Sequence, residues 1–66
     1  MVDEIIYDEL CCTLTREQII DDSQKNEETP FGYIIDYIKD MYNVSIVEIW
    51  DTAKKVCEYF GFVVNV

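Results

Sequence analysis

The sequence predicts a mainly α-helical protein: a small bundle of three to four helices followed by a short C-terminal strand or extended tail. Capping residues stand before three segments, and behind each cap the apolar residues recur at helical spacing. Besides these caps and this spacing, the length of 66 residues predicts a single domain over residues 1–66. A chain of this size buries only about 60% of the surface that its unfolded form exposes, so we expect a small core and no deep pocket.

The first of the three capped helices spans about residues 16–26. A capping box opens it, because the Thr15 hydroxyl can accept from the backbone and the Gln18 side chain can reach back to the cap. Leu14 and Ile19 stand at the positions of a hydrophobic staple around that box. The polar stretch that follows predicts a loop.

The second capped helix covers residues 30–42. Thr29 is placed to cap it, and Pro30 stands at the first helical position, where proline is favoured. The apolar residues that recur at helical spacing are Phe31, Ile34, Ile35, Ile38, Met41 and Tyr42. A short turn at Asn43 and Val44 then predicts the end of the helix.

The third capped helix covers residues 45–60 and begins with another capping box, which runs from Ser45 to Glu48. Its apolar stripe consists of Ile46, Ile49, Trp50, Ala53, Val56, Cys57 and Phe60. Gly61 predicts the helix end. We expect the second and third capped helices to share one core, made of Ile34, Ile38, Ile49, Trp50 and Phe60.

The two ends of the chain are less sharply defined by their residue pattern. Residues 2–12 fit one face of a helix through their Ile and Leu residues, although Val2–Tyr7 would also serve as a strand. We favour the helix because segments rich in Asp and Glu are poor strands. Residues 62–66 favour a short strand or a docked tail, and such a strand could pair with one at the N-terminus.

Charge is the strongest compositional signal, because 14 acidic residues against five basic ones give a net charge of −9. Residues 1–28 hold nine of the acids and two of the bases, so that most of the imbalance lies there. Such a field repels nucleic acids and anionic membranes and attracts basic surfaces. A role in solubility alone is the other explanation. The acidic N-terminus and the lack of a long apolar run predict a cytoplasmic protein.

The sequence contains few residues that could support catalysis or bind a metal ion. The chain has no histidine, and Gly32 and Gly61 lie too far apart to form a phosphate-binding loop. Its three cysteines, Cys11, Cys12 and Cys57, predict free thiols in a reducing compartment rather than a disulfide framework. We therefore predict a protein that is no enzyme and that needs no metal or other cofactor.

The residues around the third capped helix carry a resemblance at the level of fold. The turn Tyr42–Ser45 precedes this helix, and the sequence Phe-Gly-Phe-Val at residues 60–63 leads away from it in extended form. This order is similar to helix-turn-helix and winged-helix regulators, in which a small-residue turn precedes the recognition helix and a glycine leads into the wing. The resemblance covers about residues 15–66 and implies a DNA-binding function, with a homodimer as the usual form.

The face that would read DNA departs from that family. It would carry Glu48 and Asp51, whereas DNA-binding proteins place Arg, Lys, Asn or Gln there. Only Lys54 and Lys55 could reach the phosphates, and useful affinity needs several phosphate contacts. We therefore predict a helix-turn-helix-like arrangement that does not bind nucleic acid directly.

The candidate partner-binding surface combines carboxylates with two tyrosines and one valine. Its residues are Asp21, Asp22, Glu27, Glu28, Tyr33, Asp36, Tyr37, Asp40, Val47, Glu48 and Asp51. Tyrosine is enriched at the energetic centres of protein interfaces, and the alternative explanation is that these rings cover the edge of a small core.

The first functional hypothesis is an acidic binding protein of the inhibitor or adaptor class. It would engage a partner protein through that partner's basic surface, taking the place of DNA or RNA. In size and charge the chain is similar to phage and mobile-element proteins that inhibit host enzymes as nucleic-acid mimics. A DNA-binding transcription regulator and a subunit of a larger assembly are the alternatives.

Overall fold

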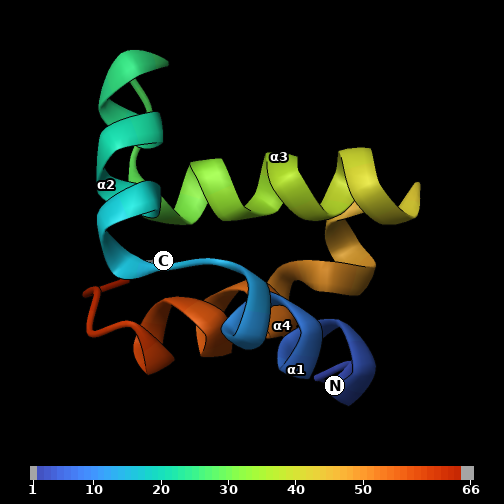
Figure 1. Cartoon of the computed structure of the whole chain (residues 1–66). Coiled ribbons are helices and arrows are strands. Elements are labelled where there is room, and N and C mark those ends of the chain that lie inside the picture. The colour runs from blue at the N-terminus through green and yellow to red at the C-terminus, as the bar shows by residue number, and fades with distance from the viewer. Residues whose placement is uncertain (1, 65–66) are drawn as a thin grey trace.

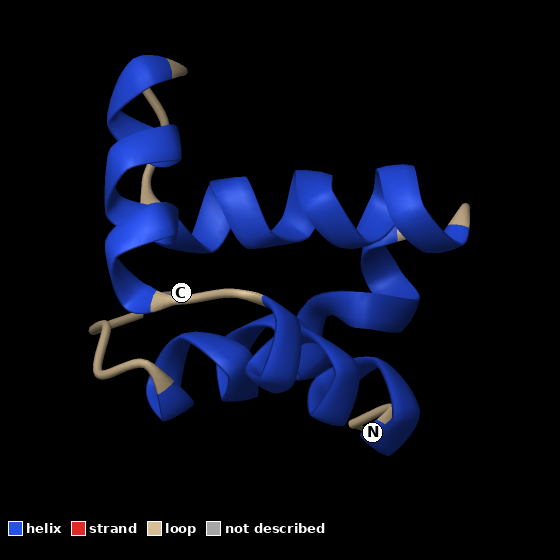
Figure 2. Cartoon of the chain, in the orientation of Figure 1, coloured by secondary structure: helices blue, strands red, loops and turns tan. Residues whose placement is uncertain are grey.

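The computed structural model describes residues 2–64, and within that range it has four helices (Figure 1). These are α1 (Glu4–Thr13), α2 (Arg16–Lys25), α3 (Pro30–Tyr42) and α4 (Ile46–Tyr59). The described part of the chain contains no strand, as Figure 2 shows. The prediction of a small, mainly α-helical bundle is therefore confirmed.

The N-termini of three helices lie where their capping residues predict them. The hydroxyl of each cap accepts a hydrogen bond from the backbone N–H three residues later, at 3.1 Å for Thr15, 3.0 Å for Thr29 and 3.4 Å for Ser45. At its other end α3 stops at Asn43, which adopts the left-handed conformation with φ 52° and ψ 49°. A short polar side chain tolerates this conformation better than most, which explains the sharp turn into α4.

The N-terminal segment forms a helix, as the sequence favoured, and not a strand. The Asp3 carboxylate caps α1 by accepting from the backbone N–H groups of Ile5 and Ile6, at 3.1 and 3.2 Å. The Asp3 backbone N–H in turn donates to the Thr52 hydroxyl at 2.8 Å. Thr52 is fully buried on α4, so this hydrogen bond fastens the start of α1 to the middle of α4.

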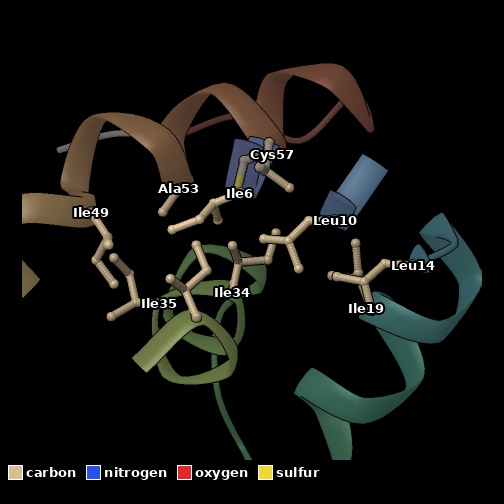
Figure 3. Close-up of a cluster of buried hydrophobic side chains, with 11 residues drawn as sticks. Ile6, Leu10, Leu14, Ile19, Ile34, Ile35, Ile49, Ala53 and Cys57 are labelled. Carbon is tan, nitrogen blue, oxygen red and sulfur yellow. The ribbon is translucent and has the colours of Figure 1, made fainter. Parts of the chain in front are cut away.

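One continuous core joins the four helices (Figure 3). In Figure 1, α3 runs above α4, α1 lies against α4, and α2 stands across the start of α3. The buried apolar residues are Ile6, Leu10, Leu14, Ile19, Ile34, Ile35, Ile38, Ile49, Ala53, Val56 and Cys57. No helix of the described range is long and apolar enough to cross a membrane.

The expected burial of Trp50 is wrong, because the side chain is 38% exposed. Trp50 lies at the edge of the α4 stripe and packs edge-on against Phe31, with 4.9 Å between ring centroids. The central positions of the stripe are filled by smaller side chains, so the indole is left at the rim. Phe60 is only partly buried, while Ile46 and Met41 are 41% and 57% exposed.

The C-terminal segment is a docked, extended tail in its described part. Phe62 and Val64 pack partly buried against the core, and no strand forms there. The Arg16 guanidinium holds the segment in place, since its Nε donates to the Phe60 carbonyl at 2.9 Å. Its carbon Cζ also lies 5.0 Å from the centre of the Phe62 ring. The last two residues of the predicted strand or tail, 65–66, lie outside the described residues.

Candidate protein-binding surface

Five of the predicted partner-binding residues come together where α2, the following turn and α3 meet. We call this set, which consists of Asp22, Glu28, Tyr33, Asp36 and Tyr37, the acidic–tyrosine face. The Tyr33 hydroxyl donates to Asp22 Oδ2 at 2.9 Å and so links α3 to α2. The rings of Tyr33 and Tyr37 lie one helical turn apart, with centroids separated by 6.1 Å. The face is therefore an ordered array of rings and carboxylates rather than a set of independent side chains.

Tyr33 is the fixed point of this array. Burial raises the pKa of its phenol to about 12, and the hydrogen bond to Asp22 adds to the effect. The hydroxyl consequently stays protonated as a donor at neutral pH and holds the Asp22 carboxylate in one position. Preorganised groups of this kind lose little conformational entropy when a partner binds.

Glu28 brings a second carboxylate into close range of Asp36. Its side chain folds over the first turn of α3, where Oε2 comes 3.9 Å from the place that a Cβ on Gly32 would take. This oxygen is buried, and within residues 2–64 it has no hydrogen-bond partner. Burial raises the pKa of Glu28, and the charge of Asp36 raises it further. A cationic group placed between these two carboxylates would relieve both effects.

Three other predicted residues border this face. Asp40 is exposed one turn beyond Asp36, on the side of α3 that points away from the buried isoleucines. Asp21 is exposed on α2 beside Asp22, and Glu27 is exposed in the turn with a positive φ of 55°. All three carboxylates thus extend the negative charge around the acidic–tyrosine face.

The remaining predicted residues lie elsewhere, on α4. Val47 is 88% exposed, Glu48 is exposed, and Asp51 is already engaged in a polar interaction within the chain. Asp36 and Asp40 lie on the far side of α3 from the residues that α3 buries. The α4 residues are therefore separated from these acids by the width of a helix, and the predicted surface divides into two regions.

Two of the five basic side chains are engaged away from this face. Arg16 is committed to the C-terminal tail, and Lys55 pairs with Glu58 on α4 at 3.4 Å. No ion pair between side chains of the described residues involves Asp22, Glu28 or Asp36. The carboxylates of the acidic–tyrosine face therefore keep their charge available to a partner.

Two of the three thiols, those of Cys11 and Cys57, are poorly suited to nucleophilic chemistry. Cys57 is fully buried, and burial raises its pKa to about 11. Burial also raises the pKa of Cys11, although a hydrogen bond from Tyr7 partly opposes the change. A thiol with a raised pKa holds little of the reactive thiolate at neutral pH. Among residues 2–64, no three His, Cys, Asp or Glu side chains are grouped to hold a metal ion.

Sequence reasoning missed an apolar region on α4. Ile46 and Trp50 were both assigned to the core, yet both are substantially exposed. The spacing already placed Trp50 beside Val47, which the same reasoning treated as exposed, so the border position of the indole was a usable signal. The bonds from Tyr33 to Asp22 and from Arg16 to Phe60 had no such signal, because they join separate helices.

Comparisons with protein-family models, with curated proteins and with solved structures found no match to this chain.

Proposed function

We propose that the protein is a non-catalytic binding protein, of the inhibitor or adaptor class, that engages a basic surface of a partner protein. The observation that carries the proposal is the acidic–tyrosine face. In the described chain no ion pair joins a Lys or Arg side chain to its carboxylates, and two tyrosine rings lie among them. Charge of one sign beside aromatic rings suits a surface rich in Arg and Lys.

The two kinds of side chain have different tasks in this proposal. The carboxylates create a long-range field that draws a basic partner toward the face and orients it. Tyr33 and Tyr37 provide flat, partly buried rings against which an Arg side chain can stack. Because Tyr33 is already fixed by Asp22, the face requires little reorganisation on binding.

The class of partner follows from its charge. Large basic surfaces are typical of proteins that bind nucleic acid. We infer that the chain competes with DNA or RNA for such a surface in the cytoplasm, as nucleic-acid-mimicking inhibitors of phages and mobile elements do. This inference rests on size and charge, since the chain carries −9 on 66 residues.

A DNA-binding regulator is the second candidate. The observation in its favour is the pair α3 and α4, joined by a connection of three residues with Asn43 in the left-handed conformation. The exposed carboxylate of Glu48 at the start of α4 opposes it, as does the net charge. Fluorescence anisotropy with mixed duplex DNA at physiological salt separates the two candidates, because our proposal predicts no binding there.

Affinity capture from cell lysate tests the proposal. The comparison is between the wild-type chain and a variant with Asp21, Asp22, Asp36 and Asp40 all changed to Asn. We expect the wild type to retain a basic protein that the variant loses, while both show the same helical circular dichroism. Retention of the same proteins by both forms would contradict the proposal.

A further inference from the structure

The start of α4 presents an apolar surface that the described chain leaves uncovered. Ile46, Val47 and Trp50 are 41%, 88% and 38% exposed, and Met41 at the end of α3 is 57% exposed. Residues three and four positions apart lie on the same side of a helix, so the three α4 side chains are neighbours. We call Ile46, Val47 and Trp50 the α4 apolar face. Contiguous exposed apolar side chains of this kind are typical of interaction sites.

Trp50 is held in a defined position within this face. Its ring meets Phe31 of α3 edge-on, with 4.9 Å between centroids and an interplanar angle of 81°. This is the favoured geometry for an aromatic pair, and it fixes the indole while leaving more than a third of its surface open. A rigid, partly exposed tryptophan is the kind of side chain that dominates interface energies.

The described C-terminal tail does not cover the α4 apolar face. Arg16 holds the tail through Phe60 and Phe62, which follow the other end of α4. The helix from Ile46 to Tyr59 has 14 residues, and at 1.5 Å of rise per residue its two ends are about 20 Å apart. The described residues of the tail therefore leave this face open to a partner.

The net charge of the chain favours some classes of binding partner for the α4 apolar face over others. A second copy would bring another charge of −9 against this one, and nucleic acids and anionic membranes would be repelled in the same way. Glu48 is exposed between Val47 and Ile49, so a carboxylate borders the apolar side chains, while Lys54 stands one turn beyond Trp50. A protein segment with apolar anchors and a basic flank toward Glu48 fits this side of the face and the overall field.

We propose that the α4 apolar face docks an amphipathic helix of a partner protein, with apolar side chains against Trp50 and Val47 and with Lys or Arg on the flank toward Glu48. A helix is the fitting element because the described chain has no strand edge to which a partner strand could add. This inference rests on the proposed function and gives it a second contact region. The apolar face slows dissociation, and the acidic–tyrosine face speeds association.

The probes for the test are two synthetic peptides of identical composition, rich in Leu, Ala and Lys. One places its leucines at i, i+3, i+4 and i+7, so that they form a single stripe on a helix, and the other has them scattered. Trp50 is the only tryptophan of the chain, so the shift of its fluorescence on titration reports binding at this face directly. Sedimentation velocity of the protein alone is run beside the titrations.

Two matched variants locate the contact. Val47→Asp introduces a charge into the α4 apolar face, and Val63→Asp makes the same change at a valine of the tail with nearly the same exposure, 85% against 88%. Neither side chain is buried, so both variants should fold. A third variant, Asp36→Asn with Asp40→Asn, weakens the acidic–tyrosine face and reports on the proposed function separately.

We expect the striped peptide to bind at least about tenfold more tightly than the scattered one, with a blue shift of Trp50 emission. Val47→Asp should abolish that difference and Val63→Asp should preserve it. Equal binding of the two peptides would overturn the inference, and so would a dimer that Val47→Asp dissociates. A third result is that the two peptides bind the wild type equally and both bind the variant Asp36→Asn with Asp40→Asn more weakly. In that case the proposed function would stand and this inference would be wrong.

Discussion

The acidic–tyrosine face, which α2 and α3 form, and the α4 apolar face are built by opposite means. The first is polar, and a hydrogen bond between helices fixes it, from the Tyr33 hydroxyl to Asp22. The second is apolar, and the packing of Trp50 on Phe31 fixes it. The difference teaches that a domain with a small core can still order two surfaces, provided that each surface is anchored by one contact between helices.

The largest expected loss of stability comes from substituting a core residue, and it exceeds the loss from substituting Trp50 in the α4 apolar face. Ile38→Ala removes a fully buried side chain, so it should lower the free energy of unfolding by about 2–5 kcal/mol. Trp50→Ala should cost only about 1–2 kcal/mol, because the indole lies at the rim and mainly loses its pairing with Phe31. Urea denaturation followed by circular dichroism measures both. A larger loss for Trp50→Ala than for Ile38→Ala would show that Trp50 is a core residue after all.

The two faces should also differ in the kinetics of binding to the captured partner. Asp21→Asn with Asp22→Asn should lower the association rate about tenfold at low salt, and by more than it raises the dissociation rate, because the charge of these carboxylates acts at long range. Trp50→Ala should instead raise the dissociation rate, since an anchor side chain is lost. Surface plasmon resonance resolves the two rates. Equal effects of both variants on both rates would remove the distinction between the faces.

A smaller effect should follow from breaking the anchor of the acidic–tyrosine face. Tyr33→Phe removes the hydrogen bond to Asp22 and should reduce stability by about 1 kcal/mol. Tyr37→Phe is the matched control, because that ring stands one turn away on the same helix. Thermal unfolding of the two variants under one condition makes the comparison. Equal losses would mean that the Asp22 hydrogen bond contributes nothing specific.

The smallest effect concerns the Glu28 carboxyl and depends on pH. Because its pKa is raised above the ordinary value of 4.5, the folded state binds this proton more tightly than the unfolded state. The contribution of Glu28 to stability therefore falls as the pH rises through its folded-state pKa. Glu28→Gln should be slightly stabilising at neutral pH, and the gain should disappear below 4.5. Glu27→Gln in the same turn is the control, and a gain independent of pH would contradict this account.

The sequence allowed much of this architecture to be predicted, because helix ends are local. Thr15, Thr29 and Ser45 each mark a cap within their own few residues, and each helix begins where they indicate. The extent to which the Trp50 side chain is buried could not be predicted, because it depends on which smaller side chains fill the space between α3 and α4. Helical periodicity gives the side of a helix on which a residue lies but not how far the neighbouring helix extends over it.

The candidate site was predictable only in part, for a related reason. The carboxylates and tyrosines were visible as residue types, but the grouping of Asp22, Tyr33 and Tyr37 depends on how α2 crosses the start of α3. It was also not visible in the sequence that the predicted partner-binding residues divide into two regions. Val47 and Glu48 belong to α4, which packs against the buried side of α3. Contacts between elements distant in sequence decide both points.

The dependence of association on salt tests the central claim most directly. The Debye length falls from about 30 Å at 0.01 M ionic strength to about 8 Å at 0.15 M, so a rate that depends on the field of the acidic–tyrosine face must fall over this range. Surface plasmon resonance of the wild-type chain against the captured partner measures that rate. We predict a decrease of about tenfold or more, carried by the association rate. An association rate that is the same at both salt concentrations would show that the charge serves solubility alone, and the proposal of a basic target would be wrong.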